Sequence, residues 1–204
     1  PKENDLQLFI WTTSRAKVPI HFCSSMRIIS GYHKGRTIRP PKNLPVRPTT
    51  DMAKEGLFNI LNNLVDFEEL KVLDLFCGTG NISFEFVSRG AVSVTSVDAN
   101  ARCAGFVKST FDELKYNSGT IIKADALRFV ESSKGKWDLI FADPPYAYEQ
   151  YHKFVNTILD NGLLSDEGIL IVEHPAEVDF STFPAHTQTR KYGRVHFSFF
   201  ELES

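Results

Sequence analysis

Cysteines are few in this sequence and long apolar runs are missing, and both features limit what the chain can be. Its 204 residues include three cysteines, Cys23, Cys77 and Cys103, without a C-x-x-C pair, and its six histidines form neither an H-x-x-H nor an H-E-x-x-H pattern. A disulfide framework and a zinc site are therefore disfavoured. No stretch approaches the roughly 18 apolar residues of a membrane-spanning helix. We therefore expect a soluble, cytoplasmic monomer with no metal and no membrane contact.

Length and composition predict one globular domain with an appendage. Hydrophobic residues make up 42% of the chain and charged residues 24%, which is typical of soluble globular proteins and excludes a disordered or collagen-like chain. Residues 1–25 have no clear periodicity and form an N-terminal extension of unknown role. We expect a basic hairpin arm at residues 26–50 and a globular domain at residues 51–204.

Positive charge is concentrated near the start of the chain. The formal net charge is −2, but residues 26–54 contain seven basic residues and one acid, whereas residues 55–204 are acidic overall. A basic arm on an acidic body is suited to gripping a phosphate backbone. A solvated surface hairpin has the same composition, so charge alone leaves both interpretations open.

The arm is predicted to be a hairpin followed by an extended connection. Short strands are expected at Arg27–Ser30 and Arg36–Arg39, around a turn from Gly31 to Gly35. Four prolines between residues 40 and 48 oppose a helix there. A helix is expected from Thr50 or Asp51 onward, because apolar residues then recur at helical spacing, at Leu57, Ile60, Leu61 and Leu64.

From residue 71 onward, short apolar segments alternate with amphipathic ones. Strands are predicted at Val72–Phe76, Val92–Val97, Thr120–Lys123, Leu139–Ala142 and Ile169–Glu173. Helices are predicted at residues 81–89, 100–116, 125–133 and 148–160. This alternation indicates right-handed crossovers and a mostly parallel sheet. Thr187–Tyr192 and Val195–Glu201 are expected to form an antiparallel pair at one edge, so the fold class is a doubly wound α/β domain.

The first strand of this domain leads into a glycine turn that favours ligand binding. Gly78 and Gly80 form a G-x-G pattern, and glycines at such a turn allow a ligand to approach the backbone. The third glycine of a dinucleotide fingerprint is replaced by Ser83. Asp74 would repel a pyrophosphate and suits a cationic group, such as the ammonium of an amino-acid cofactor. A purely structural, hydrogen-bonded Asp74 is the alternative.

Further acids follow the next two strands. Asp98 lies about twenty residues after the glycines, where a carboxylate accepts hydrogen bonds from ribose hydroxyls. Asp125 is placed to accept from an adenine amino group, and each of these two acids has capping of the following helix as its alternative role. Because the carboxyl ends of parallel strands share one edge, we expect Asp74, Asp98 and Asp125 to converge on one crevice.

The fourth strand ends in the most specific motif of the chain, Asp143-Pro144-Pro145-Tyr146. The two prolines remove two N–H donors and fix the backbone, so the local carbonyl groups form a rigid set of acceptors. The Asp143 carboxylate and the Pro144 carbonyl are suited to binding the two hydrogens of a planar amino group. Tyr146 offers a ring on which a base can stack. An ordinary turn with Tyr146 in the core is the alternative.

These motifs, in this order, resemble those of the S-adenosylmethionine-dependent amino-methyltransferases. The N-terminal residues narrow the resemblance to the bacterial 16S ribosomal RNA guanine-N2 methyltransferase family, often labelled RsmD, over residues 26–203. They are Met26-Arg-Ile-Ile-Ser-Gly31, Gly35-Arg36, Arg47-Pro-Thr-Thr-Asp51 and Glu55-x-Leu57-Phe58-Asn59. The family usually has Arg-x-x-Arg-Glu after the two threonines, and this chain has Lys54 in place of the second arginine.

The resemblance implies a Rossmann-like, seven-stranded methyltransferase sheet whose last strand is antiparallel. It also implies S-adenosylmethionine as cofactor, and 16S rRNA or the assembling small ribosomal subunit as partner. The residues expected to act in catalysis are Asp143, Pro144, Pro145 and Tyr146. Those expected to bind the cofactor are Asp74, Phe76, Gly78, Gly80, Asp98, Ala99, Asp125 and Ala126. Those expected to bind RNA are Arg27, Lys34, Arg36, Arg39 and Arg47.

Three other functions compete with this prediction. The same tetrapeptide would serve methylation of adenine or cytosine amines in DNA, or of a protein glutamine, although the chain has no separate target-recognition domain. A nicotinamide-dependent oxidoreductase is disfavoured by Asp74 and by the missing third glycine. A non-enzymatic RNA-binding module is disfavoured because the acids and the tetrapeptide are intact.

Overall fold

The computed structural model of the chain describes residues 25–41, 44 and 51–202. Nearly all of the N-terminal extension, and Arg47 of the predicted arm, lie outside the described residues. The N-terminal elements are β1 (Met26–Arg27), β2 (Thr37–Ile38), α1 (Asp51–Leu61) and the short 3-10 helix η1 (Phe67–Glu69). The strands that follow are β3 (Lys71–Leu75), β4 (Ser93–Asp98), β5 (Gly119–Lys123), β6 (Trp137–Ala142), β7 (Leu164–His174), β8 (His186–Tyr192) and β9 (Val195–Glu201). The helices between them are α2 (Asn81–Ser88), α3 (Ala101–Glu113), α4 (Ala126–Ser132) and α5 (Tyr151–Asp160).

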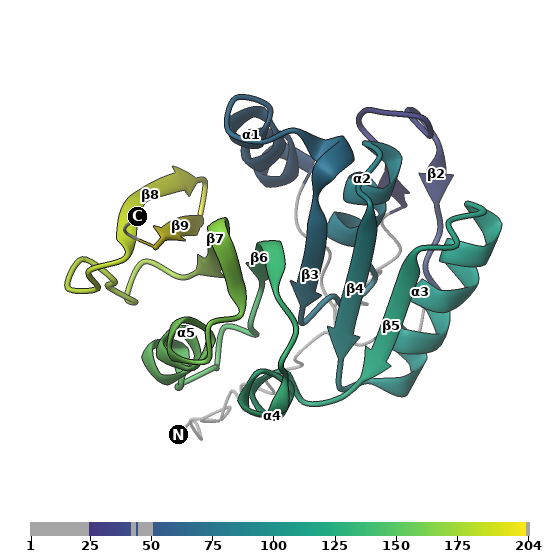
Figure 1. The fold of residues 1–204 in the computed structure, drawn as a ribbon. Helices are drawn as coiled ribbons and strands as arrows, with labels where there is room; N and C mark the ends of the chain where they lie inside the picture. The colour runs from purple at the N-terminus through teal and green to yellow at the C-terminus, as the bar shows by residue number, and fades with distance from the viewer. Residues whose placement is uncertain (1–24, 42–43, 45–50, 203–204) are drawn as a thin grey trace, which may run out of the picture.

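The seven strands from β3 to β9 form one sheet in the order β5-β4-β3-β6-β7-β9-β8 (Figure 1). Neighbouring strands from β5 to β7 are parallel, and β9 is antiparallel to both β7 and β8. The predicted α/β sheet with an antiparallel last strand is therefore confirmed. The chain moves outward from β3 to β5 and then returns to the other side of β3 with β6. This reversal creates a switch point at the carboxyl ends of β3 and β6, where such sheets bind ligands.

The last two strands differ in burial, and this difference explains their positions. Phe197, Phe199 and Phe200 of β9 are fully buried. Most residues of β8 are polar and exposed or half-buried. The last strand therefore lies inside the sheet, between β7 and β8, and the polar β8 forms the edge.

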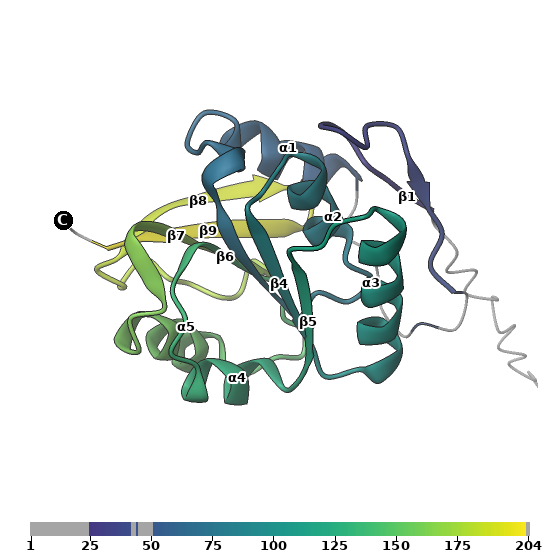
Figure 2. The same cartoon turned by 45° about the vertical axis from the view of Figure 1, so that its right-hand side comes forward.

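Alternate residues of the strands pack into two separate cores. One core lies under α1, α2 and α3 and includes Val72, Phe141 and Ile171 from the sheet. The other lies under α4 and α5 and includes Leu73 and Ala142. The helices thus cover both faces of the sheet, with α4 and α5 on the face away from α2 and α3 (Figures 1 and 2). Among the described helices, none is both long and apolar enough to cross a membrane.

The N-terminal hairpin lies outside the helices α2 and α3 (Figure 2). Its turn contacts the end of α2, where the Tyr32 amide donates to the Ser88 carbonyl oxygen at 2.7 Å. A Cβ atom on Gly31, which has a φ of +80°, would lie 1.8 Å from that same oxygen, so only glycine fits there. The hairpin therefore follows α2 away from the carboxyl ends of the parallel strands, and its turn is at the opposite end of the molecule (Figure 1).

The first strand of the hairpin is shorter than predicted because a carboxylate replaces the partner strand. The amides of Ile29 and Ser30 donate to the two oxygens of Glu85, at 2.9 and 3.0 Å, instead of to β2. Glu85 is fully buried in α2 and also accepts from Arg89 Nε at 3.0 Å. The strand predicted over Arg27–Ser30 therefore ends at Arg27.

A buried lysine completes this attachment of the arm. Lys54 of α1 is 1% exposed, and its ammonium donates to the Arg27 carbonyl at 2.7 Å and to Asn81 Oδ1 at 2.8 Å. It lies 3.6 Å from the Glu85 carboxylate. Burial lowers the pKa of Lys54, and the charge of Glu85 opposes that shift. Lys54 thus joins the arm, α1 and the first residue of α2.

We expect Lys54→Met to lower the free energy of unfolding by about 1–3 kcal/mol, because it removes the buried donor to the Arg27 carbonyl and to Asn81, while Glu85 keeps Arg89 as its ion-pair partner. Denaturation in urea measures the effect. Lys34→Met is the matched control, since Lys34 is exposed on the hairpin turn, and it should change stability by less than about 0.5 kcal/mol. Equal effects of the two substitutions would contradict a stabilising role for the Lys54 ammonium.

Candidate active site

A cavity of about 590 Å³ opens at the carboxyl ends of β3, β4, β6 and β7. Nine of the predicted catalytic and cofactor-binding residues line it: Asp74, Phe76, Gly78, Asp98, Ala99, Asp143, Pro144, Pro145 and Tyr146. Gly80 lies in the same turn as Gly78. Asp125 and Ala126 are not part of the lining, and the Asp125 carboxylate caps α4 by accepting from the Arg128 amide at 3.0 Å. Among the described residues, no cluster of three or more histidine, cysteine or acidic side chains could hold a metal ion.

The turn after β3 brings the backbone to the cavity. Phe76, Gly78 and Gly80 have φ angles of 60°, 53° and 77°, in the left-handed region that glycine tolerates. A Cβ atom on Gly80 would also meet the Phe84 ring at 2.7 Å. Gly80 therefore serves both the turn and the close packing of α2, which begins at the next residue.

Asp98 fixes this turn from the neighbouring strand. Its two carboxylate oxygens accept from the Gly78 amide at 2.9 Å and from the Asn100 amide at 2.7 Å. A carboxylate has about four acceptor positions, so Asp98 retains capacity for hydroxyl groups of a ligand. The predicted ribose acceptor is thus held by two backbone bonds at the cavity wall.

Asp74 is buried below the turn, with 1% of its surface exposed. It accepts a short hydrogen bond from the Ser83 hydroxyl, which also lies 2.7 Å from the Ser96 hydroxyl. Burial raises the pKa of Asp74 to about 7; the charges of Asp143 and Asp98 add to the shift, and the hydrogen bond from Ser83 opposes it. A carboxylate in this position is stabilised by a cation. The two acceptor carboxylates therefore fit the ammonium of an amino-acid cofactor above Asp74 and a ribose beside Asp98.

Asp143 continues β6 into the cavity, and its amide donates to the Leu75 carbonyl at 3.3 Å. Burial raises the pKa of Asp143 well above its usual range, and the charge of Glu173 raises it further. Glu173 lies near the end of β7, is 5% exposed and also lines the cavity. Sequence reasoning missed Glu173, although it ends a predicted strand as Asp98 does.

Tyr146 lies at the rim of the cavity and is 56% exposed. The alternative of Tyr146 in the core is therefore wrong. Pro144, two residues before it, is buried, whereas Pro145 is exposed. The tetrapeptide thus places a carboxylate inside the cavity and an aromatic ring at its opening.

Another part of the cavity wall comes from the far end of the chain, which sequence reasoning did not assign to the site. The turn between β8 and β9 contributes Tyr192 to Val195, and α1 contributes Met52. The Tyr192 hydroxyl donates to the Gly56 carbonyl at 3.2 Å, and a Cβ atom on Gly56 would lie 2.1 Å from the Tyr192 ring. Glycine at 56 thus allows the turn to pack on α1. Arg194 in this turn is exposed and brings a positive charge to the cavity.

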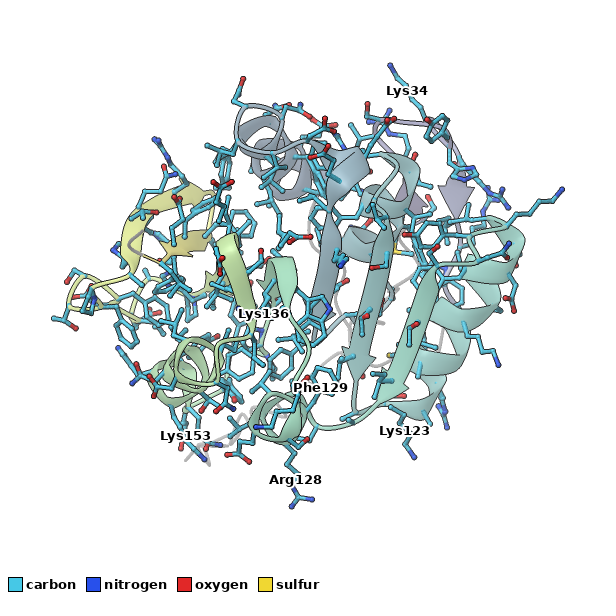
Figure 3. All side chains as sticks on the ribbon, in the orientation of Figure 1. Lys34, Lys123, Arg128, Phe129, Lys136 and Lys153 are labelled. Carbon is cyan, nitrogen blue, oxygen red and sulfur yellow. The ribbon has the colours of Figure 1, made fainter. Side chains whose placement is uncertain are left out.

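The predicted RNA-binding residues do not gather at this cavity. Arg27, Lys34, Arg36 and Arg39 are all exposed. Arg27 lies near the site end of α2, because its carbonyl bonds Lys54, whereas Lys34 is on the distant turn. Arg36 lies 3.6 Å from Glu113 at the far end of α3. Figure 3 shows Lys34 at one end of the molecule and Lys123 and Arg128 at the other, the end toward which β3, β4 and β5 point.

The order of the strands, the glycine turn with Asp98 and the Asp-Pro-Pro-Tyr motif define the Rossmann-like S-adenosylmethionine-dependent methyltransferases. A family model described as Conserved hypothetical protein 95 matches residues 26–201, and the chain belongs to this family. The resemblance to the RsmD family drawn from the sequence is thereby confirmed.

Similar proteins share most of their length with this chain. Ribosomal RNA small subunit methyltransferase D of Escherichia coli K12 is 29% identical over 192 residues, which cover 92% of this chain and 96% of the relative. The protein of the same name from Haemophilus influenzae is 30% identical over 152 residues, covering 72% and 78%. The Escherichia coli match is long enough to include both residues 26–50 and the sheet that follows them.

Solved structures agree with this assignment. The Escherichia coli protein yhhF is 30% identical with a TM-score of 0.77, over 88% of this chain and 99% of that one. The Thermus thermophilus 16S rRNA N2 methyltransferase RsmC, solved with AdoMet and guanosine, has a TM-score of 0.70 at 18% identity. That match covers 89% of this chain and 50% of RsmC, and it supports the fold alone.

Proposed function

We propose that this protein transfers a methyl group from S-adenosylmethionine to the exocyclic N2 amine of a guanine in 16S ribosomal RNA. The observation that carries the proposal is the cavity itself, which combines Asp143 and the exposed Tyr146 with the acids Asp74 and Asp98. The names of the relatives, which are small-subunit rRNA methyltransferases, support RNA as the acceptor.

The tetrapeptide supplies the acceptor groups that this reaction needs. The lone pair of a guanine amine is delocalised into the ring, so the nitrogen is a poor nucleophile. Hydrogen bonds from its two hydrogens to the Asp143 carboxylate and the Pro144 carbonyl shift the nitrogen toward a tetrahedral geometry and direct its lone pair. The base has to leave its stack to reach the cavity, and Tyr146 at the rim offers a ring on which it can stack.

The cofactor supplies an activated methyl group on a sulfonium when it is bound, and the protein positions the reacting groups and excludes water. Asp74 holds its ammonium group and Asp98 its ribose hydroxyls, while Phe76, Gly78 and Ala99 contribute the wall between them. Asp125 and Ala126 cap and begin α4 outside the cavity lining. We keep Asp125 as the proposed partner of the adenine amino group and Ala126 as a proposed cofactor contact.

RNA contacts are expected along the arm, which lies outside α2 and α3 (Figure 2). Arg27 and Arg39 lie at the site end of the arm, Lys34 and Arg36 follow α2 away from it, and Arg47 completes the basic set. The eight residues of α2 span roughly 12 Å. Lys34 and Arg36 would therefore hold phosphates of nucleotides about that far from the target base. We place the protein in the cytoplasm as a monomer acting on 16S rRNA or on the assembling small subunit.

Cofactor affinity is expected to depend on pH through Asp74. In the free protein the pKa of Asp74 is about 7, so below pH 7 binding of an ammonium group has to displace a proton. The dissociation constant for S-adenosylmethionine should therefore rise by up to about tenfold for each pH unit between 7 and 5. Calorimetric titrations in buffers of different ionisation enthalpy measure both the affinity and the released proton. Asp74→Asn should bind weakly at every pH and release no proton, and an unchanged pH dependence in this variant would assign the effect to another group.

The acceptor class is tested by transfer of a radiolabelled methyl group. Labelled S-adenosylmethionine is supplied with small subunits from cells lacking this enzyme, with the 16S RNA extracted from them, with DNA and with a protein extract. The proposal predicts label in the small subunit or its RNA, and none in subunits from cells that contain the enzyme. Label in DNA or protein alone would reject RNA as the acceptor and leave the amino-methyltransferase chemistry in place.

A further inference from the structure

Two carboxylates meet at the part of the cavity where the substrate amine would lie. Strands β6 and β7 are parallel neighbours with Phe141 opposite Ile171 and Ala142 opposite Val172. Asp143 and Glu173 each follow these pairs by one residue, so they occupy equivalent positions on adjacent strands. Because side chains alternate between faces, both belong to the face of Phe141 and Ile171, which α1, α2 and α3 cover.

This position brings Glu173 within reach of the same planar ligand as Asp143. Neighbouring strands lie about 4.8 Å apart. Two side chains at equivalent positions on such strands can therefore bind two neighbouring groups of the same base. Both residues line the cavity, and Glu173 has 5% of its surface exposed. Its carboxylate therefore meets a bound ligand in a largely water-excluded environment, where a hydrogen bond discriminates strongly between donors and acceptors.

The edge of guanine has a pattern of donors that suits this pair. An ionised carboxylate only accepts hydrogen bonds. Guanine presents its N1–H beside its N2 amine, so two neighbouring groups donate. Adenine has an unprotonated N1 beside its N6 amine, and cytosine an unprotonated N3 beside its N4 amine, so in both bases a lone pair would face the second carboxylate.

We propose that Glu173 is the residue that selects guanine, by accepting a hydrogen bond from N1–H while Asp143 and the Pro144 carbonyl hold the N2 amine. This assignment rests on the proposed function and adds a specificity determinant to it. It excludes adenine and cytosine as methyl acceptors in this cavity, because the ring nitrogens beside their amines cannot donate to Glu173.

The electrostatics of the pair agree with a role in binding donors. Placing Glu173 beside Asp143 raises the pKa of Asp143 beyond the shift that burial causes, so the two acids repel each other in the absence of a ligand. This repulsion disfavours the folded state, and it is reduced when N–H groups of a ligand bind both acids. Groups that oppose folding in this way are concentrated at functional sites.

The test exchanges the base at the methylated position, which is first mapped in labelled subunits. Small subunits are reconstituted with 16S RNA into which a synthetic segment has been ligated, carrying either guanine or 2-aminopurine at that position. 2-Aminopurine keeps the amine but lacks N1–H. The wild-type enzyme should methylate guanine at least 100-fold faster in kcat/KM, since 2-aminopurine leaves the buried carboxylate facing a lone pair.

Glu173→Gln should reduce this preference by at least tenfold, because the amide N–H can donate to N1 of 2-aminopurine. Glu177→Gln is the matched control: Glu177 is exposed four residues further along, and its substitution should leave the preference unchanged. Cofactor affinity of Glu173→Gln, measured by calorimetry, shows that the variant is folded.

Two outcomes overturn the proposal. One is that the wild-type enzyme methylates both bases at similar rates. This comparison does not use the variant, so it decides the question even if the variant fails to fold. The other is a Glu173→Gln variant that slows both reactions equally. In either case guanine is still methylated, so the proposed function stands. Absence of methyl transfer to any small subunit would instead reject the proposed function itself.

Discussion

Asp143→Ala is expected to lower the rate of methyl transfer by a factor of about 10² to 10⁴ while changing cofactor affinity by less than threefold. The substitution removes the carboxylate that we propose as the acceptor for the substrate amine, and without it the amine would keep its lone pair in conjugation with the ring. Asp74 and Asp98, which we propose as the residues that hold the cofactor, are on other strands and retain their partners. Single-turnover transfer to small subunits and calorimetric titration of the cofactor separate the two effects.

A matched control distinguishes this effect from a general loss of charge. Asp166 is fully exposed and forms only a surface ion pair with Lys136, at 3.7 Å, so Asp166→Ala should leave both rate and affinity unchanged. Near-normal turnover of Asp143→Ala would show that the tetrapeptide does not hold the amine. An equal loss of cofactor affinity would show instead that Asp143 belongs to the cofactor site.

Asp98→Ala is expected to weaken cofactor binding by about 100-fold or more. The substitution removes the proposed acceptor for the ribose hydroxyls, and hydrogen bonds to a charged group contribute about 1.5–3 kcal/mol each. It also leaves the amides of Gly78 and Asn100 without the carboxylate that now binds them at 2.9 and 2.7 Å. The turn that carries the backbone to the cavity would therefore lose the side-chain bond at Gly78 and keep only its backbone bond from the Cys77 amide to the Val97 carbonyl, at 3.1 Å.

The Asp98→Asn variant provides a graded comparison, because its amide retains one acceptor oxygen. Dissociation constants should increase in the order wild type, Asp98→Asn, Asp98→Ala, while the rate at saturating cofactor falls by much less. An Asp98→Ala affinity within threefold of the wild type would contradict the assignment of Asp98 to the cofactor.

The fold and most of the cavity were predictable because they depend on local patterns. Each motif can be recognised from a short segment: the G-x-G turn, an acid that follows a strand, or the Asp-Pro-Pro-Tyr motif. The parallel strands then bring these segments to one edge of the sheet. The helix from Asp51 was also predicted, but it ends at Leu61, so Leu64 of the predicted apolar stripe is 46% exposed. Phe58 of this helix is instead fully buried and packs on Phe67 and Phe86.

The features that were missed depend on contacts between distant parts of the chain. Glu85 ends the first arm strand by accepting the amides of Ile29 and Ser30, which lie more than fifty residues earlier. Tyr192 completes the cavity wall through its contact with Gly56, 136 residues away. No local periodicity reports such contacts. Glu173 is different, since the rule applied to the other strand ends applies to it equally.

The central claim is that this cavity methylates the N2 amine of a guanine in 16S RNA. The most direct measurement is mass spectrometry of nucleosides from 16S RNA of cells lacking the enzyme, before and after complementation with the wild-type gene or with Asp143→Ala. We expect one N2-methylguanosine per 16S RNA to be absent in the deficient cells, restored by the wild type and not restored by the variant. An N2-methylguanosine content that is the same in all three strains would contradict the claim.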